Sequence, residues 1–466
     1  MRMKGLFSRI GIAATGMILA FGTQGLVQAD EPWSLFDLGT LGGDWSRPYD
    51  INESGHIVGS SQLDPQSNKY HGWFLTLDTG MVDIDPAVTK KSKSRGINNS
   101  EIIVGWFNVP DQGPHAYRKL PGGELMDLGT FGGLTSKARS INEDGWIAGF
   151  ADDANGHPIA FRWDPTSQQK VSLGTLASGN ESEARSINNF GDVTGLSNIT
   201  PDGTDNRAFF WDHTTGSMVD LGTLGGASSI AYGLNDSGMV IGDSNDTSGK
   251  RKAFVWDNGV MQKLTTLGGA DTLGGLESLA RGVNNLGQVV GRSNVSDGSM
   301  HGFLWDSVNG MIDVNDLLPM NSLWVVTEIR SINDNGYMVG TAEFDGGPSH
   351  AVLMAPALSM DTPDPGLAGE ANWFRAHGAV PQATVYLLAS NQQGQTPVPF
   401  CGSLMIDLAQ PITLIATRSA SNEGNAKAKR KVGARFAGKT IYLQAIERTG
   451  LFDCRASALV AYQFPQ

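Results

Sequence analysis

One phrase recurs seven times along this chain, and it restricts the possible folds more than any other feature. Each copy has an apolar residue, Asn, two variable residues and usually Gly, with a second Gly four positions later. Successive asparagines are 46, 44, 46, 47, 49 and 49 residues apart. A period in this range indicates an array of similar units that bury their cores against one another. The copies span residues 51–59, 97–105, 141–149, 187–195, 234–242, 283–291 and 332–340.

Each repeat contains four short apolar segments separated by Gly, Asn, Asp and Pro, and none has a helical period of 3.6 residues. We therefore expect four strands per repeat and almost no helix. The Asn-x-x-Gly step suits a type I turn between the first two strands. The 60 glycines among 466 residues fit a fold with many tight turns. Four-stranded units of this length, repeated four to eight times, are typical of the blades of a β-propeller.

The array of repeats is offset, because it begins and ends inside a repeat rather than at its boundary. Residues 33–43 contain the phrase of a fourth strand without the three strands before it, whereas the seventh copy stops after its third strand at Met354. The N-terminal strand is therefore expected to complete the last blade, which closes the ring and removes an open sheet edge. The predicted fold class is all-β: a seven-bladed β-propeller closed by the N-terminal strand, plus a small C-terminal β-sandwich. A β-solenoid and stacked sandwiches are the alternatives.

Two short motifs carry a family resemblance. The phrase Leu-Gly-Thr-Leu-Gly-Gly at 221–226 and the His-Ala/Gly-aromatic triplets at 115–117 and 301–303 resemble the HAF-type probable extracellular repeats of bacterial secreted proteins. The resemblance covers residues 36 to about 355 and implies an extracellular repeat protein, with no catalytic motif to transfer. Because Ile159, Arg207 and Lys252 replace the histidine in three copies, we expect it to form hydrogen bonds within its own blade.

Residues 1–29 have the pattern of a signal peptide. Three basic residues precede the apolar stretch 10–19, and Val27 and Ala29 stand at the positions that a leader peptidase requires, so cleavage is expected after Ala29. An uncleaved anchor is the alternative, but the stretch is too short to span a membrane. We expect a secreted, periplasmic or cell-surface protein without a transmembrane anchor. The net charge of −13 argues against nucleic acid as a partner.

One column of the repeat is rich in arginine. Two residues before the apolar residue of each copy, five copies have arginine and two have tyrosine. First strands lie innermost in propellers, so these guanidinium groups would line a central channel and bind a carboxylate or sulfate. Pairing with the fourth-strand carboxylates Asp37, Asp83, Asp127, Asp220 and Asp313 is the alternative. The candidate ligand-binding residues are Arg95, Arg139, Arg185, Arg281 and Arg330, with Tyr49 and Tyr232 in the other two copies.

Metal and catalytic motifs are scarce. Asp152 with Asp153 and Asp202 with Asp205 are candidate calcium ligands, although no loop has the spacing of a dedicated calcium site, and no other cofactor is expected. The sequence lacks a nucleophile elbow, a zinc-protease motif and a phosphate loop, so no catalytic residue is assigned. It favours a non-catalytic binding or scaffold protein whose partner is an extracellular polysaccharide or a surface protein. The alternative is a polysaccharide-active lyase or glycosidase with residues drawn from several blades.

The repeat region, residues 30–358, is followed by a predicted linker at 359–366 and a C-terminal domain at 367–466. Short alternating segments in that domain predict an antiparallel β-sandwich. Its two cysteines, Cys401 and Cys454, are expected to form one disulfide in an exported protein. The basic run from Lys427 to Arg435 is expected at a solvated hairpin tip, with contact to an anionic surface as its functional alternative. The strands are expected at 372–376, 384–389, 404–408, 413–417, 440–446 and 458–464.

Overall fold

The structure is a computed structural model that describes residues 33–465 except 77–78, 87–90, 202, 204, 269–275, 399–400, 402–403 and 450–453. The predicted signal peptide, residues 1–29, lies outside the described residues. The described chain consists of β-strands and two short 3-10 helices, η1 (Val314–Leu317) and η2 (Ala434–Phe436), and the expected all-β class is confirmed. Within these residues, no helix is long and apolar enough to cross a membrane.

Seven four-stranded antiparallel sheets occupy residues 34–355, and we number them sheet 1 to sheet 7 in chain order. Sheet 1 contains β2 (Ser46–Ile51), β3 (Ile57–Gln62), β4 (Tyr70–Thr76) and β5 (Gly80–Asp83). Sheet 2 contains β6 (Ser92–Ile97), β7 (Ile103–Asn108), β8 (Pro114–Lys119) and β9 (Leu125–Asp127). Sheet 3 contains β10 (Gly132–Ile141), β11 (Ile147–Asp153), β12 (Pro158–Trp163) and β13 (Lys170–Gly174). Sheet 4 contains β14 (Ser182–Ile187), β15 (Val193–Asn198), β16 (Asn206–Asp212) and β17 (Ser217–Asp220). Sheet 5 contains β18 (Gly225–Leu234), β19 (Val240–Asp246), β20 (Arg251–Asp257) and β21 (Val260–Lys263). Sheet 6 contains β22 (Ser278–Val283), β23 (Val289–Asn294), β24 (Met300–Asp306) and β25 (Gly310–Asp313). Sheet 7 contains β26 (Trp324–Ile332), β27 (Met338–Phe344), β28 (Ser349–Ala355) and β1 (Ser34–Asp37).

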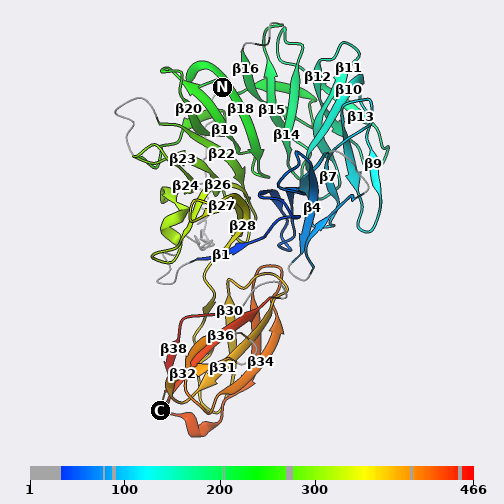
Figure 1. The fold of residues 1–466 in the computed structure, drawn as a ribbon. Helices are drawn as coiled ribbons and strands as arrows, with labels where there is room; N and C mark the ends of the chain where they lie inside the picture. The colour runs from blue at the N-terminus through cyan, green and yellow to red at the C-terminus, as the bar shows by residue number, and fades with distance from the viewer. Residues whose placement is uncertain are drawn as a thin grey trace, which may run out of the picture.

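The N-terminal strand β1 completes sheet 7, as the offset of the repeat predicts. It pairs antiparallel with β28, and Asp37 lies opposite Val352. The backbone pairing extends one residue further, because Leu38 N donates to Ala351 O at 2.9 Å. The first and last strands of the repeat region therefore lie side by side, and Figure 1 shows β1 next to β28.

The asparagine of each repeat joins its sheet to the next one. Its Oδ1 accepts a hydrogen bond from the backbone N–H four residues on, which fixes the turn between the first two strands. Its Nδ2 donates to the backbone oxygen of the equivalent asparagine in the following sheet, at 3.0–3.4 Å. The last of these bonds runs from Asn333 to Asn52 O and closes the circle. Sheets joined in a closed circle are the architecture of a β-propeller.

The final residue of the turn is in the left-handed region, which explains its preference for glycine. Gly55 has φ 76°, and the equivalent glycines of sheets 3 to 7 have φ between 77° and 93°. In sheet 2 this position is Glu101, which adopts φ 58°. A residue with a Cβ rarely takes this conformation, so the repeat favours glycine at this position.

The core lies between neighbouring sheets. The third strand of sheets 1 to 6 places a fully buried aromatic side chain there: Trp73, Tyr117, Phe161, Phe209, Phe254 or Phe303. Small residues face these rings. A Cβ added at Gly59 would lie 2.3 Å from Trp73, and one added at Gly291 would lie 2.7 Å from Phe303. The second glycine of the repeat is thus required by close packing.

The C-terminal module has two sheets that share one buried cluster. One sheet contains β29 (Ser359–Met360), β30 (Ala371–His377) and β35 (Ala426–Lys431), and the other contains β34 (Thr413–Ser419), β31 (Thr384–Ser390), β36 (Thr440–Arg448), β37 (Arg455–Ala456) and β38 (Val460–Gln463). A hairpin of β32 (Gln393–Pro397) and β33 (Met405–Leu408) forms a separate two-stranded sheet that packs against β31 and β36. The expected disulfide joins Cys401 to Cys454.

Two expectations for this module need correction. The predicted linker 359–366 begins with β29, and Met360 packs in the buried cluster. Most of the basic run is a strand and not a hairpin tip, because Ala426 and Ala428 are buried on one face of β35 while Lys427 and Lys429 are exposed on the other. Of its basic residues, only Arg435, at the end of the run, lies beyond β35, in η2. Alternation of small apolar and basic residues is the period of a strand with one buried face.

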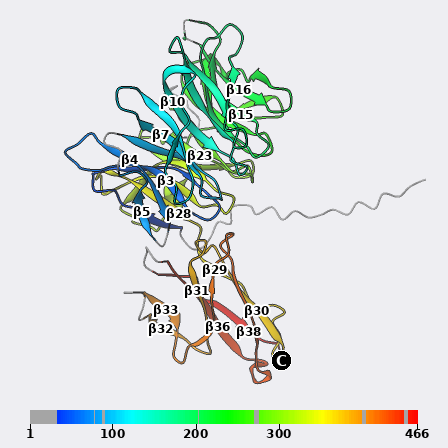
Figure 2. The ribbon, with the colours of Figure 1, turned by 90° about the vertical axis from the view of Figure 1, so that its right-hand side faces the viewer.

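The module contacts the seven-sheet ring at sheets 7 and 1 (Figures 1 and 2). Arg455 forms an ion pair with the buried carboxylate of Glu447 at 2.6 Å and donates to Pro356 O, at the end of β28, at 2.8 Å. Tyr337 is buried in a cluster with Val380 of the module, and its hydroxyl donates to Ala379 O. These contacts attach the module to the part of the ring where the first and last strands of the repeat region, β1 and β28, lie side by side.

Candidate functional site: a cationic central cavity

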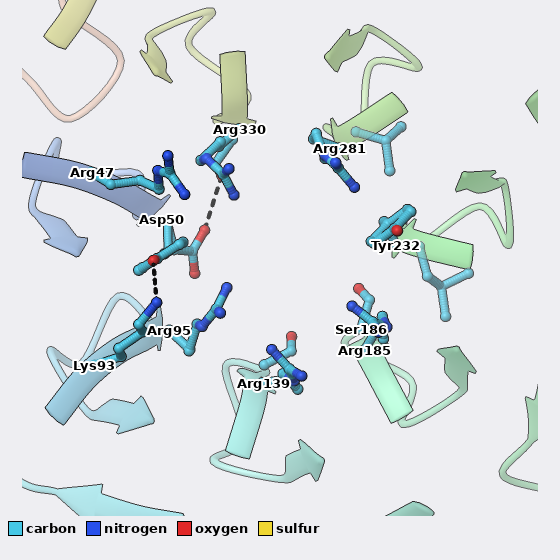
Figure 3. Close-up of a pocket in the computed structure, with 17 residues that line it drawn as sticks. Arg47, Asp50, Lys93, Arg95, Arg139, Arg185, Ser186, Tyr232, Arg281 and Arg330 are labelled. Carbon is cyan, nitrogen blue, oxygen red and sulfur yellow. Dashed lines mark hydrogen bonds between the residues drawn. The ribbon is translucent and has the colours of Figure 1, made fainter. Parts of the chain in front are cut away.

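The innermost strands of the seven sheets surround a cavity of about 450 Å³. All five predicted arginines line it, and Figure 3 shows their side chains pointing inward from separate strands. The prediction that this column lies in a central channel is therefore confirmed in position. The lining residues are Arg47, Tyr49, Asp50, Lys93, Arg95, Arg139, Ser140, Arg185, Ser186, Tyr232, Gly233, Leu234, Arg281, Gly282, Val283, Arg330 and Ser331.

A β-bulge in each innermost strand explains why neighbouring residues both face the cavity. The register of β10 with β11 shifts between Ala138 and Ser140, and the same shift occurs at the equivalent point of the other six sheets. The extra residue is Arg139, which together with Ser140 lines the cavity. In a regular strand, consecutive side chains point to opposite faces, and a bulge removes this alternation. The repeat position that holds arginine in five copies and tyrosine in two is therefore the position of the bulge residue.

Positive charge exceeds negative charge around the cavity. Seven lining residues are arginine or lysine, and Asp50 is the one carboxylate among the described lining residues. Two further glutamates lie just behind the arginines, two positions earlier in their strands. Glu183 pairs with Arg185 at 3.0 Å and Arg139 at 3.5 Å. Glu328 pairs with Arg281 at 3.0 Å and with Arg330.

Three carboxylates thus oppose seven cations. Arg95 forms no ion pair among the described residues, and its guanidinium carbon lies 4.0 Å from the centre of the Tyr49 ring. The buried Nε atoms of four cavity arginines have no hydrogen-bond partner within the described protein: Arg95, Arg139, Arg185 and Arg330. A buried donor without an acceptor costs free energy.

Burial and repulsion from neighbouring arginines lower the pKa of Arg139 and Arg330. Burial lowers the pKa of Arg139 to about 9, and the nearby charges of Arg95 and Arg185 add to this effect. Burial also lowers the pKa of Arg330 to about 10, against the opposing effect of Glu328. The guanidinium groups of Arg139 and Arg330 are therefore in an unfavourable electrostatic environment, which a bound anion would improve.

The pKa of Tyr49 also departs from its ordinary value. Burial alone would raise its pKa, but the positive charges of Arg95, Lys93 and Arg330 outweigh burial and lower it to about 7. Lys93 Nζ donates to the Tyr49 hydroxyl oxygen at 3.1 Å. The neighbouring carboxyl of Asp50 has its pKa raised to about 6 by burial, although Ile97 N and Ser331 Oγ donate to it. Two groups of the cavity therefore titrate near neutral pH.

The alternative that the arginines pair with fourth-strand aspartates is wrong. Those aspartates pair with the column that begins each third strand. His71 contacts Asp83 at 2.7 Å, and His115 contacts Asp127 at 2.8 Å. The remaining pairs are His301 with Asp313, His350 with Asp37, and Arg207 with Asp220 at 4.0 Å. Each pair lies within one sheet, which confirms the expected role of the histidines.

One of the calcium candidates, Asp153, has a local structural role. Asp153 Oδ1 accepts from Asn155 N at 2.8 Å and His157 N at 3.0 Å, as expected of a turn former. Asp202 lies outside the described residues. Sequence reasoning missed a group of three possible ligands in sheet 4, namely Asp192, Asp212 and His213. His213 Nδ1 already contacts Asp192 Oδ1 at 2.7 Å, and Asp212 accepts from Thr214.

One family model matches part of the chain. Residues 224–347, less than half of the chain, match a family model described as "Protein of unknown function (DUF3466)". The chain matches none of the curated proteins.

Similar solved structures include TolB from Acinetobacter baumannii, with 16% identity and a TM-score of 0.37. The match covers 68% of this chain and 64% of TolB, which is less than two thirds of that protein. The β-propeller domain of the Trilobed protease from Pyrococcus furiosus has 11% identity and a TM-score of 0.44, over 66% of this chain and 95% of that one. The gluconolactonase XC5397 from Xanthomonas campestris has 12% identity and a TM-score of 0.34, over 69% of this chain and 89% of that one.

Proposed function

We propose that the protein is a secreted binding protein of the HAF-type extracellular repeat kind, which holds an anionic ligand in the cavity of a seven-bladed propeller. In this interpretation, the seven sheets are the blades, β1 closes the ring, and the C-terminal module is a small β-sandwich. The observation that carries the proposal is the surplus of guanidinium groups, with seven cations opposed by three carboxylates. Arginine binds carboxylates and sulfates through paired hydrogen bonds, so these are the ligand groups we propose.

Charge asymmetry supports this ligand class. The chain as a whole has a net charge of −13, so its surface repels anions at long range. A cationic cavity inside an acidic protein is therefore not a by-product of composition. Non-catalytic binding is favoured over glycosidase chemistry, because a glycosidase needs two carboxyl groups on either side of the scissile bond. Only one carboxyl group, that of Asp50, lines the cavity among the described residues, and it accepts two hydrogen bonds from neighbouring sheets.

One observation favours lyase chemistry as a second candidate function. The lowered pKa of Tyr49 gives a fraction of phenolate at neutral pH, and a phenolate is a suitable general base. It would take the proton from the carbon next to a bound carboxylate. The electron pair left behind would form a C=C bond as the neighbouring C–O bond breaks. Lys93, which contacts Tyr49, would give a proton to the departing oxygen.

Calorimetric titration of the purified protein tests binding, with galacturonate, glucuronate, sulfate and neutral glucose as ligands. We expect the anions to bind and glucose not to bind. Arg139→Gln should weaken anion binding at least tenfold, since a charge-assisted hydrogen bond contributes about 1.5–3 kcal/mol. Arg418→Gln removes the same charge from an exposed site on β34 and should leave affinity unchanged. Absence of anion binding would contradict the proposal. Release of unsaturated sugar from a polyuronate, lost in Tyr49→Phe, would establish the lyase.

A further inference from the structure

A cluster of lysines and aromatic rings continues from the cavity onto sheets 1 to 3, with Trp45 and Tyr70 half-buried and with Trp106 and Phe150 buried. We call it the aromatic–lysine platform and define it as Trp45, Tyr70, Lys91, Lys93, Trp106, Lys137 and Phe150. The rings follow one another: the Trp45 and Tyr70 centroids are 5.8 Å apart, and those of Tyr70 and Trp106 are 6.2 Å apart. Lysine ammonium groups lie between them. The cavity and the platform share one residue, Lys93, which lines the cavity.

Each lysine of the platform lies over at least one ring. Lys91 Nζ is 5.2 Å from the centre of Tyr70, and Lys93 Nζ is 5.0 Å from the same ring and 5.9 Å from Trp106. Lys137 Nζ is 5.4 Å from Trp106 and 5.6 Å from Phe150. No carboxylate lies within ion-pair distance of these three ammonium groups among the described residues. The ammonium groups of Lys91 and Lys137 are therefore available to an external anion, whereas Lys93 already donates to the Tyr49 hydroxyl oxygen.

The platform occupies only one side of the ring, which argues against a purely structural role. In sheets 2 and 3, a lysine of the innermost strand lies opposite an aromatic residue of the second strand, as Lys93↔Trp106 and Lys137↔Phe150. The same pair of positions in the other sheets holds Arg47↔Ser60, Glu183↔Leu196, Ile230↔Asp243, Leu279↔Arg292 and Glu328↔Thr341. A feature needed to build each sheet would recur in every one of them, as the asparagine does.

We propose that the platform binds the sugar rings of an acidic polysaccharide that has one charged residue in the central cavity. This inference rests on the proposed function, because it assigns the ligand class of the same cavity and extends the site outward. Sugar rings have an apolar face that packs on aromatic rings, and their carboxylates or sulfates would fall on the interleaved lysines. Trp45 and Tyr70 remain half-buried and so present part of their rings to solvent.

An acidic glycan fits better than a nucleic acid, which also combines ring stacking with negative charge. A nucleic acid strand has one phosphate for every 3.4 Å of helix axis, so a protein of net charge −13 would repel it strongly. A polymer of uronic acids has one carboxylate per ring, and the uncharged ring faces lie between the charges. The alternation of single ammonium groups with rings on the platform matches this arrangement.

The test measures how affinity depends on chain length. Oligogalacturonides from the monomer to the hexamer are titrated into the purified protein at fixed ionic strength. We expect the hexamer to bind at least tenfold more tightly than the monomer. Trp45→Ala and Lys91→Gln should remove most of this gain and leave the affinity for the monomer unchanged. Val325→Ala shortens the side chain at the position in sheet 7 equivalent to Trp45, and it should preserve the gain.

The outcomes separate the two proposals. If the monomer binds and the hexamer binds no more tightly, the platform is overturned and the cavity proposal stands. If neither binds, the proposed function fails, and the platform fails with it. An equal gain in wild type and in both platform variants would also overturn the platform. Tighter binding of a single-stranded oligonucleotide than of the hexamer would overturn the ligand class. Lys91→Gln removes only a half-buried charge, so it remains informative if Trp45→Ala unfolds the protein.

Discussion

Arg95 and Tyr49 lie against each other across the boundary between sheets 2 and 1, with the guanidinium carbon 4.0 Å from the centre of the phenol ring. Neither residue has a carboxylate partner among the described residues. The arginine therefore has the aromatic face and the phenol oxygen of Tyr49 as its nearest source of negative charge. The two side chains come from equivalent positions of adjacent repeats, so this contact arises because one copy has tyrosine where most have arginine.

Tyr49 should ionise near pH 7 rather than near its ordinary value of 10. Its folded-state pKa is lower than its unfolded-state pKa, so its contribution to stability should grow as pH rises from about 7 to 10 and be lost as pH falls through 7. A bound anion disfavours the phenolate, and the affinity for a monovalent anion should therefore fall as pH rises through 7. Ultraviolet absorbance of tyrosinate measures the ionisation. In Tyr49→Phe, the absorbance step should disappear, and the affinity should keep only the pH dependence near pH 6 that the Asp50 carboxyl contributes.

Glu328→Gln should leave the guanidinium groups of Arg281 and Arg330 without their shared counter-charge. Glu328 is only 4% exposed, so we expect a loss of about 3–5 kcal/mol in the free energy of unfolding, as for other broken buried pairs. Added sulfate should raise the melting temperature of this variant more than that of the wild type, since the anion replaces the lost charge. Glu124→Gln removes an exposed carboxylate outside the cavity and serves as the control. Equal stabilisation of all three proteins by sulfate would contradict a cationic binding cavity.

The pair of His115 and Asp127 can be exchanged for its counterpart in sheet 3, where the equivalent residues are Ile159 and Ser172. His115→Ile or Asp127→Ser alone should destabilise the protein, because each leaves a polar group without its partner. The double variant should be more stable than the sum of the single effects predicts, by about 0.5–3 kcal/mol. Urea unfolding of the four proteins measures this coupling. Strict additivity would show that the 2.8 Å contact contributes nothing.

Asn98→Ala should break two bonds at once, the turn bond from Ile102 N and the bond to Asn142 O in the next sheet. Because Asn98 is buried, we expect a loss of about 1–3 kcal/mol for each group left without a partner. Ser100→Ala changes an exposed residue of the same turn and should have little effect. Thermal unfolding distinguishes the two. Similar melting temperatures for both variants would contradict a structural role for the asparagine ring.

Reduction of the Cys401–Cys454 disulfide should act on the C-terminal module. The bond closes a loop with a sequence separation of 53, and the chain-entropy relation for this length gives about 4 kcal/mol of stabilisation. Proteolysis after reduction should therefore cut the module before it cuts the seven-sheet ring. The variant Cys401→Ser with Cys454→Ser should behave like the reduced protein without a reductant. Cleavage in the ring first would contradict this localisation.

Much of the architecture can be predicted from the sequence, because its main signals are local and repeated. The asparagine phrase marks the turns, and the offset of the array predicts that β1 joins sheet 7. The pairing of third-strand and fourth-strand residues also has a sequence signal that was missed. Where the histidine is replaced by Ile159, the aspartate is replaced by Ser172, so the two columns change together.

The partners of the arginines could not be predicted in the same way. Glu183 and Glu328 occur in only two of the seven copies, each two residues before an arginine, and spacing does not show that each serves arginines of two sheets. The bulge is also invisible in the repeat, since it depends on backbone register. In the C-terminal module, the alternation of Ala426 and Ala428 with lysines was a usable strand signal, but the high local charge suggested a loop instead.

The pairing of β1 with β28 also determines when the seven-sheet ring can close during synthesis and folding. Asp37 and His350 face each other although 313 residues separate them in the chain. The strand synthesised first therefore remains without its sheet partner until nearly all the repeats have been made and brought together. Contacts between such distant segments are costly in chain entropy and slow to form. A chain that ends before β28 therefore leaves β1 unpaired, so the ring closes only when all seven sheets are present.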